Sequence, residues 1–289
     1  MRSPLVYLNG KYLPLEEACI PVLDRGFIFG DGVYEVIPVY NGNPFRLPQH
    51  LQRLEDSMQA VRIDNPCKRQ EWSAIITKVI EENGGGDQSV YLQVTRGVAR
   101  RDHRFPGDTR PTVFVMSNPV SPVPAGELSE GVAAVTLEDI RWQYCHIKSI
   151  ALLPNILMRQ QAVEQDAVEA ILLRDGEVSE GAASNVFIVK EGVILTPPKS
   201  ERLLPGITRD LVVELAEKHQ LPCKETAIGE TELLHADEVW LTSSLKEILP
   251  VTRLNGQPVS DGRPGPVWQQ MYTIYQDYKQ ALRQNKAGA

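Results

Sequence analysis

Apolar and polar residues alternate in short runs near the N-terminus, and Asn-Gly dipeptides separate these runs. Two pairs of runs have this form: residues 6–8 and 12–13 flank Asn9-Gly10, and residues 33–37 and 45–47 flank Asn41-Gly42. Alternation places the apolar side chains on one face of a strand, and Asn-Gly readily forms the two-residue turn of a hairpin. The pattern therefore predicts two β-hairpins.

Helical periodicity replaces this alternation after Pro48. Apolar residues then recur at intervals of three or four positions, at Leu51, Leu54, Met58 and Val61. This spacing forms a stripe along one side of an α-helix, and proline is favoured in a first helical turn. A second helix is predicted over residues 72–82, because three glycines follow Asn83 and favour a helix end.

The rest of the chain mixes predicted strands with predicted helices. Strands are expected at residues 90–95, 112–117, 132–137, 170–173, 185–189 and 238–241, and helices at 153–165, from 207 onward and at 267–282. Prolines crowd residues 119–124, which excludes a regular element there and predicts a stiff linker over residues 119–128. We expect an N-terminal α/β domain over residues 1–118 and a second mixed domain over residues 129–289.

Composition limits the classes of function. The 289 residues carry a formal net charge of −7, so the chain lacks the basic balance of a nucleic-acid-binding protein. No apolar run approaches the length of a membrane span, and the first residues lack the apolar core of a signal peptide. The four cysteines are scattered, which argues against a zinc site or a disulfide framework. A cytoplasmic protein that binds neither nucleic acid nor membranes is expected.

Two residues suggest a specific chemistry. Lys148 lies in Cys-His-Ile-Lys-Ser, and Glu180 opens a run of small residues about thirty positions later. A lysine amine forms a Schiff base with pyridoxal phosphate, and a carboxylate keeps the pyridine nitrogen of that cofactor protonated. Taken alone, Lys148 also fits an ordinary exposed lysine, and Glu180 also fits an exposed residue in a turn.

Five motifs occur together in this order: Asp24-Arg25-Gly26-Phe27-Ile28-Phe29-Gly30-Asp31-Gly32-Val33-Tyr34-Glu35, Cys145-His146-Ile147-Lys148-Ser149, Glu180-Gly181-Ala182-Ala183-Ser184-Asn185, Leu204-Pro205-Gly206-Ile207-Thr208-Arg209 and Leu241-Thr242-Ser243-Ser244. With them, nearly the whole chain resembles the fold-type-IV pyridoxal-phosphate enzymes, and specifically the D-amino acid transaminases. The resemblance implies a two-domain α/β (mixed α+β) architecture with pyridoxal 5'-phosphate in the interdomain cleft.

The resemblance also implies roles for individual residues. Lys148 corresponds to the Schiff-base lysine and Glu180 to the acid beside the pyridine nitrogen. The phosphate is expected at the start of the helix that Ile207 and Thr208 begin, where N–H groups favour an anion, although Thr208 is equally suited to cap that helix. Further phosphate ligands are implied at Ser243, Ser244 and Arg53; without the resemblance, Arg53 reads as a solvated helix arginine.

Substrate recognition is expected in the basic segment near residue 100. The resemblance implies that Arg101, His103 and Tyr34 bind the substrate carboxylate, and that this loop reaches the active site of a neighbouring subunit in a homodimer. Arg100 and Arg104 lie close enough in sequence to leave the choice of arginine open. An arginine suits this role because its guanidinium binds a carboxylate through two parallel hydrogen bonds.

We therefore expect ping-pong transamination between a D-amino acid, such as D-alanine, and a 2-oxo acid, such as 2-oxoglutarate. A branched-chain L-amino acid aminotransferase and an aminodeoxychorismate lyase remain alternatives with the same cofactor, and the Arg101-x-His103 pair argues against the former. A protein that binds the cofactor without turnover is a third alternative, from a different class.

Overall fold

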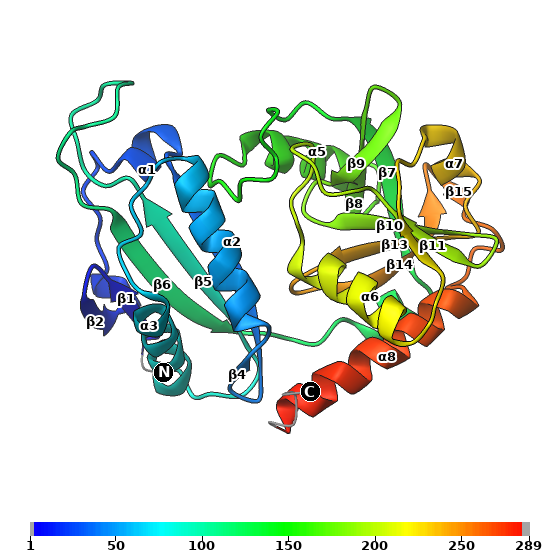
Figure 1. Cartoon of the computed structure of the whole chain (residues 1–289), viewed down its shortest axis with the longest axis horizontal. Helices are drawn as coiled ribbons and strands as arrows, with labels where there is room; N and C mark the ends of the chain where they lie inside the picture. Colours follow the sequence, from blue (N-terminus) through cyan, green and yellow to red (C-terminus); the bar gives the residue numbers. More distant parts are fainter. Residues whose placement is uncertain (1–2, 285–289) are drawn as a thin grey trace. The chain divides into compact units, whose positions relative to one another are not determined.

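The computed structural model describes residues 3–284, which form two compact units (Figure 1). Within the described residues, unit 1 consists of residues 3–121, Ile147–Leu152 and 282–284, and unit 2 of Pro122–His146 and Leu153–Ala281. The chain first passes from unit 1 to unit 2 after Ser121, and the short segment that contains Lys148 returns to unit 1. The domain limits 1–118 and 129–289 stay a prediction.

Unit 1 contains one antiparallel sheet with helices on one face. Its six strands have the order β2-β1-β6-β5-β3-β4. The bounds are β1 (Leu5–Leu8), β2 (Lys11–Pro14), β3 (Gly32–Tyr40), β4 (Asn43–Pro44), β5 (Gln88–Thr95) and β6 (Thr112–Pro119). The helical elements are η1 (Leu15–Glu17), α1 (Arg25–Phe29), α2 (Leu47–Ala60) and α3 (Arg69–Glu82).

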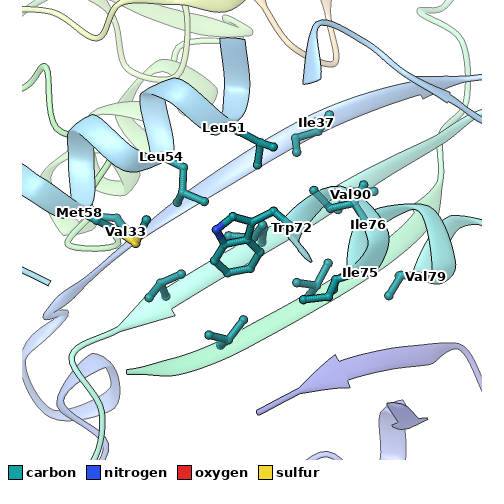
Figure 2. Close-up of a cluster of buried hydrophobic side chains, with 14 of the residues drawn as sticks. Val33, Ile37, Leu51, Leu54, Met58, Trp72, Ile75, Ile76, Val79 and Val90 are labelled. Carbon is teal, nitrogen blue, oxygen red and sulfur yellow. The ribbon is translucent and has the colours of Figure 1, made fainter. Parts of the chain in front are cut away.

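The core of unit 1 lies between the sheet and the helices α2 and α3. The predicted stripe of α2 is confirmed, because Leu51, Leu54 and Met58 are buried in this core. They belong to the same buried cluster as Trp72 of α3, whose side chain is fully buried (Figure 2). Burying each such side chain contributes roughly 1.5–3 kcal/mol, so this stripe fixes α2 on the sheet.

Unit 2 contains a mixed sheet of nine strands. Eight strands have the order β12-β11-β10-β13-β14-β7-β8-β9, and β15 pairs with β14. The bounds are β7 (Val132–Glu138), β8 (Glu169–Arg174), β9 (Glu177–Gly181), β10 (Asn185–Lys190), β11 (Val193–Thr196), β12 (Cys223–Glu225), β13 (Glu238–Ser243), β14 (Glu247–Leu254) and β15 (Gln257–Pro258). Turns at Asp175-Gly176 and Glu191-Gly192 connect β8 to β9 and β10 to β11.

Five helices accompany this sheet: α4 (Ala125–Ser129), α5 (Leu153–Val163), α6 (Ile207–Lys218), α7 (Glu230–Leu234) and α8 (Pro266–Arg283). The last two residues of α8 group with unit 1. The helices α5, α6 and α8 begin within one residue of their predicted starts, because apolar periodicity marks them clearly. The prediction of a mixed α/β chain is confirmed.

One local prediction is wrong. Residues 45–47 do not form a strand: β4 ends at Pro44, Arg46 has a φ of 46°, and Leu47 already begins α2. Proline in the first turn favours an early helix start, so the hairpin closes with a strand of two residues. The linker over residues 119–128 stays a prediction: β6 ends at Pro119, residues 120–124 form no regular element, and the short helix α4 begins at Ala125. Pro119 is tolerated because it is the last residue of β6, and Pro124 because it precedes the first residue of α4.

Over residues 3–284, we find no helix that combines the length and the apolar character needed to cross a membrane.

Candidate functional site

Lys148 is held in unit 1 by backbone contacts on both sides of its peptide. Its N–H donates to Ser57 Oγ of α2 at 3.2 Å, and its carbonyl accepts from the N–H of Tyr34 in β3 at 2.9 Å. The amine Nζ lies 4.3 Å from the centroid of the Tyr34 ring, within cation–π range. The structure therefore brings together Lys148 and Tyr34, which the sequence predicts for a single site.

Arg53 lies on α2, the helix that also contacts the Lys148 backbone, but it is not a solvated arginine. Its side chain is 6% exposed, and its Nε and Nη2 atoms each donate to the Glu35 carboxylate at 2.8 Å. His50 Nδ1 contacts the same carboxylate at 2.7 Å. Burial opposes the ionisation of Glu35, yet Arg53 and His50 hold the pKa of this carboxyl well below its usual range.

Sequence reasoning missed Glu35 and His50 as functional candidates, although a signal was present. Glu35 occupies an inward position of β3 between Val33 and Ile37, where an unpaired carboxylate would be very costly. On α2, His50, Arg53 and Ser57 follow one another at helical spacing and are all buried. A polar row at this spacing beside an apolar row indicates a built polar site.

Burial lowers the pKa of His50 below its ordinary value, although Glu35 opposes this effect. His50 is therefore neutral at pH 7, with Nδ1–H as the donor to Glu35. Its other ring nitrogen, Nε2, is buried and has no hydrogen-bond partner among residues 3–284. Such an atom is costly to leave unpaired, which suggests that this part of unit 1 is built to face a polar ligand.

Glu180 lies on β9 of unit 2, a strand that the sequence prediction did not include. Its Oε2 accepts from the Leu204 N–H at 3.0 Å and from Asn185 Nδ2 at 3.2 Å, and its Oε1 accepts from Arg141 Nη1. Burial raises the pKa of Glu180 to about 7 against the opposing effect of Arg141. A carboxylate accepts about four hydrogen bonds, so a further donor can still be accommodated.

The start of α6 has the features of an anion site. Its N-cap is Gly206, which provides no side-chain cap for the first N–H groups, and Ile207 and Thr208 are buried. A Cβ at Gly206 would lie 1.9 Å from Asn185 Oδ1, so this close approach requires glycine. Helix N-termini favour anions through free N–H groups and the helix dipole.

The predicted phosphate ligands on β13 lie next to this helix start. Thr208 Oγ1 donates to the Ser243 carbonyl at 3.2 Å, which joins α6 to the end of β13. Ser243 and Ser244 are half-buried, and the buried hydroxyl of the neighbouring Thr242 has no hydrogen-bond partner in the part of the chain that the structure describes. The structure thus brings four predicted phosphate ligands, Ile207, Thr208, Ser243 and Ser244, into one region of unit 2.

Arg101 and His103 lie on an exposed loop of unit 1 and both contact Phe29. The Arg101 guanidinium carbon lies 5.5 Å from the centre of the Phe29 ring, and the His103 ring centre lies 5.5 Å from it. The middle of the loop is held by Arg25, whose Nη1 donates to the Asp102 carbonyl at 2.6 Å. The structure brings Arg101 and His103 together on one surface of the loop.

Comparisons with known proteins all identify aminotransferases as similar to this chain. The family model described as amino-transferase class IV matches residues 32–254. A D-alanine aminotransferase from Bacillus licheniformis is 42% identical over 272 residues, which cover 94% of this chain and 96% of the relative. A D-alanine aminotransferase from Listeria monocytogenes serotype 1/2a (strain 10403S) is 40% identical over 273 residues, which cover 93% and 94%.

The similar solved structures are also aminotransferases, but their names give branched-chain amino acids as substrates. A branched-chain aminotransferase from the thermophilic archaeon Thermoproteus uzoniensis, with norvaline, has a TM-score of 0.90 and 27% identity, and the similarity covers 98% of this chain and 97% of that chain. The branched-chain amino acid aminotransferase from Thermobaculum terrenum in its PLP form has a TM-score of 0.87 and 27% identity, with coverage of 99% and 97%.

Proposed function

Because the chain belongs to the amino-transferase class IV family, we propose that it uses pyridoxal 5'-phosphate to transfer an amino group from a D-amino acid, such as D-alanine, to a 2-oxo acid. The observation that carries this proposal is the similarity to D-alanine aminotransferases along nearly the whole chain. The fold alone does not decide the substrate, since related folds support different activities.

The residues present fit the cofactor. Unit 2 offers an anion site without a side-chain cap at the start of α6, and Glu180 is a buried carboxylate that can accept one more donor. These two features suit a phosphate and a protonated ring nitrogen, respectively. When bound, pyridoxal phosphate supplies a ring that withdraws electrons and stabilises negative charge at the substrate Cα.

Lys148 is the residue that we propose to hold the cofactor covalently and to move the proton at the substrate Cα. Its backbone is fixed by hydrogen bonds to Ser57 and Tyr34, so the amine moves only by rotation about the bonds of the Lys148 side chain. The amine lies 4.3 Å from the centroid of the Tyr34 ring, and this contact limits where the amine points. A proton delivered from one fixed position reaches only one face of the substrate, which makes the reaction stereospecific.

We propose that Ile207, Thr208, Ser243, Ser244 and Arg53 bind the cofactor phosphate. The helix start supplies backbone N–H groups, and the serines of β13 supply hydroxyl donors beside it. In the case of Arg53, Glu35 holds the guanidinium in one orientation by two hydrogen bonds. An oriented arginine loses less conformational entropy when it binds an anion.

The substrate carboxylate is assigned to Tyr34, Arg101 and His103, in a homodimer whose neighbouring subunit receives the exposed loop. Two groups of exposed apolar residues support such a dimer: Val22 and Phe27 in unit 1, and Leu153 and Ile156 on α5 in unit 2. Exposed apolar groups of this kind commonly mark protein–protein interfaces.

Branched-chain L-amino acid transamination is the second candidate, because solved structures with that name share the fold over nearly the full chain. The two candidates differ in the handedness of the substrate. The holoprotein should therefore be mixed separately with D-alanine, L-alanine and L-leucine without an acceptor. We expect D-alanine alone to remove the visible absorption of the bound cofactor and to release pyruvate. A response to L-leucine but not to D-alanine would refute the proposal.

A further inference from the structure

Arg141 is a buried arginine to which neither the sequence motifs nor the proposed reaction assigns a role. It lies between β7 and α5, and its side chain is 5% exposed. Its Nε and Nη2 atoms donate to the two oxygens of Asp139, each at 2.9 Å, while Nη1 donates to Glu180 Oε1. The planar guanidinium therefore connects two buried carboxylates in a fixed geometry.

Asp139 holds Arg141 in this geometry. Its carboxylate is fully buried; it also forms an ion pair with Arg174 Nη2 at 2.9 Å and accepts a hydrogen bond from Ser179 Oγ at 3.0 Å. Arg141 and Arg174 keep the pKa of Asp139 below its usual range although burial opposes them. Asp139 is therefore ionised at neutral pH, and a bidentate pair of this kind restricts the rotation of the Arg141 side chain.

Glu180 is surrounded by groups of known charge. Arg141 is the cation in contact with its carboxylate. The negative charge of Asp139, which lies behind Arg141, opposes the ionisation of Glu180. The neighbouring Cys145 thiol is neutral because burial raises its pKa. From β10 and from the segment before α6, Asn185 and Leu204 contribute only neutral donors. Arg141 is thus the group that favours the charged form of Glu180 most strongly.

We propose that Arg141 is a positioning residue, held by Asp139, that keeps Glu180 as an oriented carboxylate facing the cofactor nitrogen. The inference rests on the proposed function. A cation in contact with a carboxylate lowers the proton affinity of that carboxylate. A proton shared between Glu180 and the ring nitrogen therefore stays on the nitrogen, which leaves Glu180 charged in the holoprotein.

The test is a titration of Glu180 in the apoprotein, followed by infrared spectroscopy of the protonated carboxyl stretch. Glu180→Gln identifies the band, because it removes the signal. We expect the wild-type band to titrate near pH 7. Arg141→Gln should move the midpoint upward by roughly 1–3 pH units, the usual effect of an adjacent arginine. Arg141→Lys, which keeps the charge, should restore most of the wild-type midpoint.

Arg202→Met is the matched control, because that half-exposed arginine pairs with Asp175 and not with Glu180. It should leave the midpoint unchanged. An unchanged midpoint in Arg141→Gln would overturn the inference. If Arg141→Gln does not fold, the titration of Arg141→Lys is the test. A Glu180 midpoint more than about one pH unit above the wild-type midpoint in that variant would overturn the inference. Failure of the apoprotein to bind pyridoxal phosphate would refute the proposed function instead, since the carboxyl titration needs no cofactor.

Discussion

The buried ion pair between Arg53 and Glu35 gives the sharpest prediction about stability. In Arg53→Met, Glu35 loses two charge-assisted hydrogen bonds of 2.8 Å while its side chain remains 0% exposed. Removing one partner of a buried pair leaves an uncompensated charge and typically costs about 3–5 kcal/mol. We expect the free energy of unfolding of unit 1 to fall by about that amount at pH 7.

The pH dependence has a definite sign. In the wild type the pKa of Glu35 is depressed, so its stabilising effect is complete above its unfolded pKa of about 4.3 and is lost only as the pH falls through the folded pKa. In Arg53→Met, burial raises that pKa above the unfolded value. The variant is then destabilised further as the pH rises, and the difference from wild type should grow from about pH 5 to pH 8.

The assay is native-state hydrogen exchange of α2 and β3 peptides in increasing urea, because this method reports on unit 1 alone. Arg69→Met is the matched control: Arg69 also makes two hydrogen bonds to one carboxylate, that of Glu55, but on the surface. It should change exchange little. The double variant Glu35→Gln/Arg53→Met should be more stable than Arg53→Met. A loss below about 1 kcal/mol in Arg53→Met, or one that does not grow with pH, would refute the reasoning.

Three further predictions concern the site. Lys148→Ala should abolish transamination and the visible absorption of the bound cofactor, as read by spectrophotometry; a variant with full activity would exclude Lys148 as the reactive amine. Arg101→Ala should raise KM for D-alanine roughly 10–100-fold with a smaller change in kcat, because a charged hydrogen-bond pair to the substrate is lost; normal KM in steady-state kinetics would transfer the role to a neighbouring arginine. Gly206→Ala should weaken pyridoxal-phosphate binding at least about tenfold in fluorescence titrations, because the added Cβ would lie 1.9 Å from a side-chain oxygen of β10. Gly229→Ala is the control: it also changes a helix N-cap, but the added Cβ would meet no atom within 4 Å, so binding should not change.

The sequence by itself determined the elements with strong periodicity. The apolar stripe of α2 and the Asn-Gly turns rest on local physics, in which side-chain spacing and backbone preference agree. The motifs also pointed to Lys148 and Glu180, because few residue types can perform the corresponding chemistry. Local rules failed at residues 45–47, where alternation predicted a strand but the chain turned into a helix.

Only the tertiary structure decided which polar residues are buried, and with which partners. Arg53 looks like a surface arginine on its helix, yet it is paired inside the protein with Glu35, a residue of β3. Arg141 lies 39 positions from Glu180 in sequence and still contacts its carboxylate. The charge of such groups depends on burial and on neighbours brought together by folding, and neither is encoded in the spacing of residues along the chain.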